Sequence, residues 1–78
     1  MDQNAQADVK AHLMQTDAEF RRLVNEHSDY AHKLDDLASR PHLTEQQQIE
    51  EVRLKKLKLH AKDRIEVVLS RYRAQHVA

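Results

Sequence analysis

The segment Arg53-Leu54-Lys55-Lys56-Leu57-Lys58-Leu59-His60-Ala61-Lys62-Asp63-Arg64-Ile65 decides the fold of this chain. It contains neither Gly nor Pro, and nearly all of its residues are good helix formers. Leu54, Leu57, Ala61 and Ile65 share one side of a helix, whereas most other positions are basic or polar. The segment is therefore typical of the middle of a long amphipathic helix whose apolar side is covered by another element.

Composition favours one small all-α domain. The chain has 78 residues, of which 33% are charged and 4% aromatic, with no Gly, one Pro and no Cys. Sheets need tight turns, which Gly, Asn and Pro supply. A chain with no Gly and one Pro is therefore expected to form helices joined by few corners. Without Cys there is neither a disulfide nor a thiolate metal site, which fits a cytoplasmic protein. The polar N-terminus does not resemble a secretory signal, and no apolar run approaches the roughly 20 residues of a membrane span.

We expect an antiparallel two-helix hairpin, similar to a coiled coil, as a single domain over residues 8–74. The first long helix is predicted over about 17–38 and the second over about 45–73, with a corner at 39–44 that contains Pro41. Capping boxes are predicted at Thr16 with Glu19 and at Thr44 with Gln47. Residues 1–7 are expected to be disordered. Before residue 17 two alternatives stay open: a short extra helix that breaks near Gln15, or one continuous helix from about Asp8.

Apolar periodicity indicates which side chains form the core. The first helix has an apolar seam of 3-4-3-4-3 spacing, and the second has one broad apolar face. The predicted core consists of Phe20, Leu23, Leu34, Leu54, Leu57, Ile65 and Val68. A second apolar stripe, Ile49, Val52 and Leu59, falls on another side of the second helix. Because a lone hairpin leaves this stripe exposed, we expect a homo-oligomer, most simply a dimer of hairpins that forms a four-helix bundle.

His27 is the polar residue of the first seam. A polar side chain at such a position can specify the register of helices, and this is the preferred interpretation. A metal-binding or pH-sensing role is the alternative, since imidazole titrates near neutral pH. His27 and His32 are five residues apart, however, which is not the spacing that places two ligands side by side on a helix. We expect no metal, no cofactor and no catalytic residue, since motifs for nucleophilic or phosphate chemistry are absent.

Charge is divided unequally between the two halves of the chain. Residues 1–38 carry eight acidic and four basic side chains (−4), and residues 39–78 carry five acidic and nine basic ones (+4). Either the halves lie against each other, or the second helix presents a basic face to an outside partner. That face consists of Arg53, Lys55, Lys56, Lys58, Lys62 and Arg64. It suits phosphate binding, but aromatic residues for base stacking are scarce, and those present lie on the seams.

Two motifs resemble a known family. Phe20-x-x-Leu23-x-x-x-His27, followed after a polar corner by Arg53-Leu54-Lys55-Lys56-x-Lys58-Leu59-x-x-Lys62-Asp63-x-Ile65, is similar to the YdcH-like family of small bacterial proteins of uncharacterised function. The resemblance covers about residues 17–70 and implies a helical hairpin or coiled coil. It implies no catalytic residue, cofactor or substrate. This chain departs from the family pattern at Tyr30-Ala31, Ala61 and Arg64.

The sequence therefore favours a non-enzymatic, cytoplasmic helical interaction or adaptor protein that associates with itself and binds a protein partner through a helix face. Ile49, Val52 and Leu59 are the candidate contact residues. The alternative is a small nucleic-acid-binding accessory protein that uses the basic face of the second helix.

Overall fold

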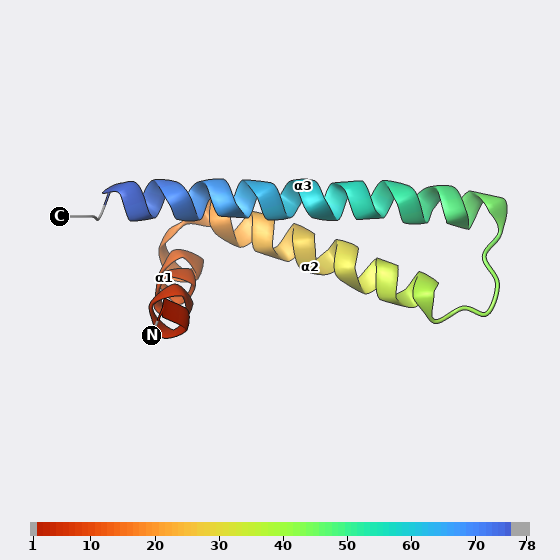
Figure 1. Ribbon diagram of the computed structural model, residues 1–78, viewed down its shortest axis with the longest axis horizontal. Coiled ribbons are helices and arrows are strands. Elements are labelled where there is room, and N and C mark those ends of the chain that lie inside the picture. The colour runs from red at the N-terminus through yellow and green to blue at the C-terminus, as the bar shows by residue number, and fades with distance from the viewer. Residues whose placement is uncertain (1, 76–78) are drawn as a thin grey trace.

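The computed structural model of the protein describes residues 2–75, and side chains for 7–75. Over this range the chain consists of three helices, α1 (Asp2–Thr16), α2 (Ala18–Ala38) and α3 (Glu45–Gln75), and has no strand. α2 and α3 lie side by side and run in opposite directions, while α1 lies at a steep angle to them near the C-terminal end of α3 (Figure 1). The molecule is elongated, with extents of 53 × 20 × 19 Å.

The corner between α2 and α3 has well-defined caps. α2 ends at Ala38, and the backbone N–H of Ser39 donates to the carbonyl of Asp35 over 3.0 Å. The capping box predicted at Thr44 is confirmed: the Gln47 N–H donates to Thr44 Oγ1 (3.1 Å), and the Thr44 N–H donates to Gln47 Oε1 (2.9 Å). Two donors at the start of α3 are thereby satisfied. Pro41 lies between these caps and has no N–H to extend either helix.

The break between α1 and α2 lies at Asp17, so the predicted capping box at Thr16 and Glu19 is wrong. Thr16 is the last residue of α1, and its Oγ1 donates to the carbonyl of His12 over 2.9 Å. Asp17 is extended (φ −121°, ψ 109°), and its Oδ1 accepts from the N–H of Phe20 over 3.0 Å. A carboxylate in this position also suits the positive end of the helix dipole. The short extra helix, rather than one continuous helix, is therefore the arrangement of the described residues.

The side chain of Arg21 on α2 binds backbone carbonyls at the C-terminal end of α1. Its Nη1 donates to the backbone carbonyls of Met14 (3.2 Å) and Gln15 (3.4 Å). The last carbonyls of a helix have no partner within that helix, so a donor from the next helix satisfies them. One aspartate and one arginine of adjacent segments thus stabilise the turn from α1 into α2.

α1 starts earlier than the sequence indicates. Disorder is expected over 1–7, whereas the structure has helix from Asp2, and Met1 lies outside the described residues. Residues 2–7 contain no helix breaker and include two alanines, the residue type with the highest helix propensity. The segment therefore continues the helix that the sequence predicts only from Asp8.

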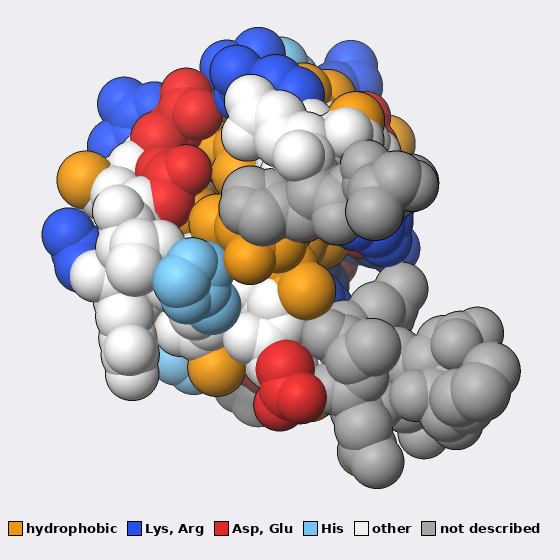
Figure 2. Space-filling view, turned by 90° about the vertical axis from the view of Figure 1, so that its left-hand side faces the viewer, with side chains coloured by type: hydrophobic (Ala, Val, Ile, Leu, Met, Phe, Trp, Pro, Cys, Tyr) orange, Lys and Arg blue, Asp and Glu red, His pale blue; other side chains and the backbone are white. Residues whose placement is uncertain are grey.

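A buried cluster joins all three helices at the end where α1 lies. It consists of Leu13, Phe20, Leu23, Val68 and Leu69, and Val9, Met14, Val24, Ile65 and Tyr72 pack against it. Figure 2, which faces this end, shows hydrophobic side chains gathered in the centre of the molecule and charged ones around them. The rings of His12 and Tyr72 also approach each other, with centroids 5.7 Å apart. α1 therefore covers the end of the α2–α3 pair.

The predicted core is partly the observed one. Phe20, Leu23, Leu54 and Val68 are buried, and Phe20 and Leu54 are the most completely enclosed, at 1% and 2% exposure. Leu34, Leu57 and Ile65 are only half-buried. Four further side chains are buried: Leu13, Leu37, Ala61 and Leu69. Leu13 becomes part of the core because the turn at Asp17 brings α1 back onto the other two helices.

The cap at Asp17 can be tested by two neighbouring substitutions. We expect Asp17→Ala to lower the free energy of unfolding by about 1 kcal/mol, because it removes the acceptor of the Phe20 N–H. Thr16→Ala removes only a bond to the preceding turn and should cost less than about 0.5 kcal/mol. Urea denaturation at one fixed protein concentration measures both values. A larger loss for Thr16→Ala than for Asp17→Ala would contradict the observed cap.

Candidate interaction surfaces

Four large apolar side chains are exposed on α3. They are Ile49, Val52, Leu59 and Val67, with exposures of 63%, 52%, 59% and 46%. We call this set the outer stripe. The sequence singled out the first three but missed Val67. Val67 lies five turns, or eighteen residues, after Ile49 and therefore on the same line of a 3.6-residue helix, so the periodicity of α3 contained the signal.

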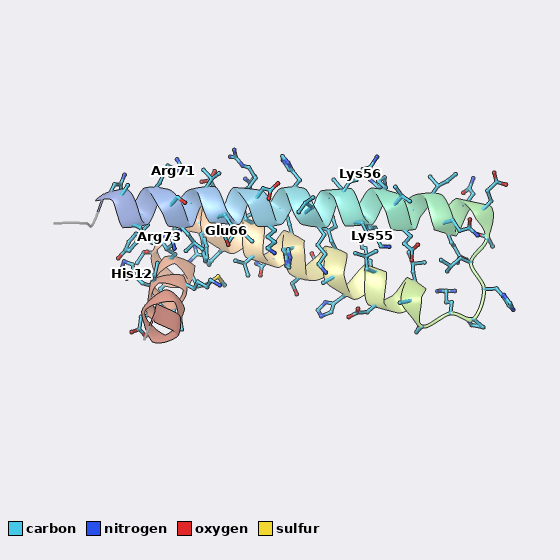
Figure 3. All side chains as sticks on the ribbon, in the orientation of Figure 1. His12, Lys55, Lys56, Glu66, Arg71 and Arg73 are labelled. Atoms are coloured by element: carbon cyan, nitrogen blue, oxygen red, sulfur yellow. The ribbon has the colours of Figure 1, made fainter. Side chains whose placement is uncertain are left out.

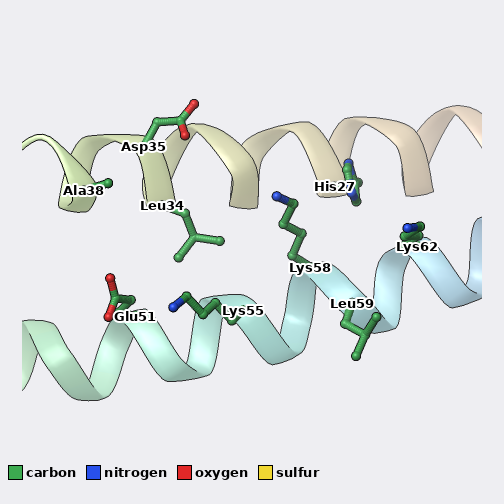
Figure 4. A pocket seen from close by; sticks show the side chains of 9 residues that line it. All are labelled: His27, Leu34, Asp35, Ala38, Glu51, Lys55, Lys58, Leu59 and Lys62. Carbon is green, nitrogen blue, oxygen red and sulfur yellow. The ribbon is translucent and has the colours of Figure 1, made fainter.

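The outer stripe lies opposite the side of α3 that packs on α2. On a wheel of about 100° per residue its four members fall within about 80°, and the buried Leu54, Ala61 and Val68 occupy the other side. Leu59 points away from α2 in Figure 4. Lys56 and Asp63 are exposed residues of the same sector, and Lys56 extends from α3 on the side opposite α2 (Figure 3). The stripe is thus an apolar line interrupted by one cation and one anion.

A second surface is a groove between α2 and α3. It consists of two hollows that share His27, Lys58 and Lys62. Figure 4 shows the side chains that line the hollow nearer the corner. The hollow nearer the corner is also lined by Leu34, Asp35, Ala38, Glu51, Lys55 and Leu59. The hollow nearer α1 is also lined by Lys10, Met14, Phe20, Val24, Ile65 and Glu66. The groove therefore has an apolar floor and a rim on which lysines outnumber carboxylates.

His27 lies on α2 at the point where the two hollows meet. Its side chain is half-buried, as expected for the edge of a seam. The two α3 residues that line both hollows with it are Lys58 and Lys62, two cations. Over the part of the chain that is described, no group of three or more His, Asp or Glu side chains is placed to hold a metal ion.

The structure places the six residues of the predicted basic face on different parts of the surface of α3. Arg53 pairs with Glu50 of its own helix, with its Nε 2.7 Å from Oε1. Arg64 reaches across to Glu19 of α2 over 3.7 Å, and Arg71 reaches the same carboxylate over 3.3 Å. Lys55, Lys58 and Lys62 line the groove, whereas Lys56 lies in the sector of the outer stripe. Between described residues of the two halves, such ion pairs form at Glu19 and, beside the corner, between Asp36 and Arg40 (3.1 Å), so the opposite charges are mostly not matched within one chain.

The family of the chain follows from a match over residues 20–69, which cover most of α2, the corner and most of α3. These residues match the family described as "Protein of unknown function (DUF465)". The chain belongs to this family, of which the YdcH-like small bacterial proteins are members. No curated protein and no solved structure matches the chain. Of the helices that the structure describes, none is both long enough and apolar enough to cross a membrane.

The pair of Glu50 and Arg53 flanks the outer stripe and gives a test by titration. Two hydrogen bonds from Arg53, of 2.7 and 3.2 Å, lower the pKa of the Glu50 carboxyl below its ordinary value. A lowered pKa means that the pair stabilises the helix when pH is above the unfolded value, and that this contribution is lost as pH falls through the folded pKa. We expect Arg53→Gln to raise the Glu50 pKa, as followed by NMR. An unchanged value would contradict the pairing.

Proposed function

We propose that the protein is a non-enzymatic helical interaction protein that associates with itself through the outer stripe of α3. In this proposal α2 and α3 form a hairpin, and a homodimer is the working unit. The observation that carries the proposal is the exposure of four large apolar side chains along one line of a 31-residue helix. Large exposed apolar lines of this kind are typical of protein–protein contacts.

Energetics support a contact at this stripe. Full burial of a Val, Leu or Ile side chain contributes about 1.5–3 kcal/mol relative to exposure. A two-fold contact buries each stripe residue twice, once in each copy. Within one chain, α2 covers only the opposite side of α3, and α1 covers only one end. A second helix on the outer stripe is the arrangement that removes these side chains from water.

The same proposal includes a role in the cell, namely that the dimer acts as an adaptor that binds a partner protein. A helix face with apolar anchors and flanking charges is one of the recurring ways in which proteins bind helices of partners. We propose that the protein works in the cytoplasm, for which its sequence without cysteine is suited. A protein partner would be bound by the assembled dimer, for which the hollow beside His27 that lies nearer α1 remains open.

Self-association can be tested with Leu59→Glu. We expect the unmodified protein to sediment as a dimer at micromolar concentration. Because each dimer would contain two buried carboxylates, the substitution should raise the dissociation constant at least about tenfold. Gln46→Glu is the matched control, since it adds the same charge at an exposed position of α3 outside the stripe. It should leave the dissociation constant of the dimer unchanged. A monomeric unmodified protein, or a dimer that tolerates Leu59→Glu, would contradict the proposal.

Nucleic-acid binding is the second candidate, and one observation favours it. Lys55, Lys58 and Lys62 line the same groove, and the ion pairs of the described residues involve arginines and none of these lysines. Such a row of free ammonium groups suits a phosphate backbone. Base stacking has little support, because Phe20 is 1% exposed and Tyr30 and Tyr72 are half-buried.

The salt dependence of binding separates this candidate from an apolar contact. If the groove binds phosphates, a fluorescent single-stranded oligonucleotide should bind, with an affinity that falls by about 0.7 log units for each phosphate contacted and each log unit of salt. Substitution of Lys55, Lys58 and Lys62 by Gln should abolish this binding. It should leave the oligomeric state, as measured by sedimentation, unchanged. Absence of binding at low salt would exclude the second candidate, whereas self-association of the apolar stripe should persist in high salt.

A further inference from the structure

From Val52 to Val67 the exposed sector of α3 is symmetric about a point between Leu59 and His60, whereas Ile49 lies outside this span and has Ser70 as its equivalent. Val52 and Val67 lie at equal distances on either side of this point, and so do Lys56 and Asp63. All four are exposed, and together with Leu59 they fall within about 80° of the wheel. Read from either end of the helix, the sector therefore presents an apolar residue, a charged residue and a central Leu. The charges at the equivalent positions have opposite sign.

Such a pattern fits one particular arrangement of two identical helices. When two copies of a helix pack in opposite directions about a two-fold axis, residues equally far from the axis meet each other. With the axis between Leu59 and His60, Val52 meets Val67 of the second copy, and Lys56 meets Asp63. Each of these contacts occurs twice, and Leu59 of each copy lies at the centre.

The charges oppose the other simple arrangements. A parallel pair of α3 helices brings Lys56 next to Lys56 and Asp63 next to Asp63, and like charges in contact are unfavourable. Two copies that met through their grooves would bring two sets of Lys55, Lys58 and Lys62 together. Only the antiparallel contact of the outer stripes places unlike charges together at both charged positions.

We propose that two copies of this chain pair their α3 helices antiparallel along the outer stripe, with Lys56 of each copy against Asp63 of the other. The proposal rests on the self-association proposed above and adds its orientation and register. α2 then lies on the outside of the dimer, and the hollow nearer α1, which no residue of the outer stripe lines, stays accessible in both copies.

Single cysteines test the orientation directly, because the chain has no cysteine of its own. A disulfide needs Cβ atoms about 3.5–4.5 Å apart, whereas the two Val52 positions of the antiparallel dimer are about 22 Å apart along the axis. We expect mild oxidation to cross-link Leu59→Cys with itself, and to cross-link a mixture of Val52→Cys and Val67→Cys. Neither Val52→Cys nor Val67→Cys alone should form a linked dimer.

A charge exchange tests the register. Lys56→Glu and Asp63→Lys each place two like-charged pairs in the dimer, so each should raise the dissociation constant about tenfold or more. The double variant restores both pairs with their signs exchanged and should return the constant to within about threefold of the original. Lys62→Glu is the control, since it makes the same change of charge in the groove, and it should leave the constant within about threefold.

The outcomes separate the two proposals. A protein that remains monomeric by sedimentation contradicts the self-association itself and with it this arrangement. A dimer in which Val52→Cys cross-links with itself contradicts only the antiparallel orientation. A dimer with no cross-link at positions 52, 59 and 67 contradicts the pairing of α3 with α3. So does a double charge variant whose dimer has a dissociation constant no lower than those of the single variants.

Discussion

The constraint on which the structure depends is that α3 has apolar residues on two sides, whereas its own chain covers only one. Leu54, Ala61 and Val68 are buried against α2 and α1. α2, with 21 residues, is also shorter than the 31-residue α3. Burial of the first side orders the helix, and the rigid helix then holds the residues of the outer stripe in a straight line. The stripe is therefore a consequence of the helix that the core forms.

Apolar periodicity made many of the buried residues predictable from the sequence. Competition between neighbouring residues for one capping position limited the prediction of helix ends. The spacing of Phe20, Leu23, Leu54 and Val68 identified buried residues, and Thr44 was correctly predicted as a cap because Gln47 completes its box. At the earlier break two adjacent residues, Thr16 and Asp17, both offer an oxygen acceptor. Sequence alone does not decide between them, since the outcome depends on which residue leaves the helix first.

Tertiary contacts account for the rest of the differences. The burial of Leu13 depends on the direction in which α1 leaves Asp17, and no periodicity within α1 encodes that direction. The basic face was predicted as one surface, but its members belong to different ones, because the arginines reach carboxylates and three lysines line the groove. The opposite charges of the two halves meet across the helices mainly at Glu19, where Arg64 and Arg71 converge.

The most direct test of the central claim is isotope-filtered NMR on a mixture of ¹³C-labelled and unlabelled protein, which detects contacts between copies only. We expect such contacts at the methyl groups of Ile49, Val52, Leu59 and Val67, which are exposed within one chain. The buried methyl groups of Leu54 and Val68 should show none. Absence of contacts between copies, or contacts confined to the groove beside His27, would contradict the account that the outer stripe of α3 is the contact surface of this protein.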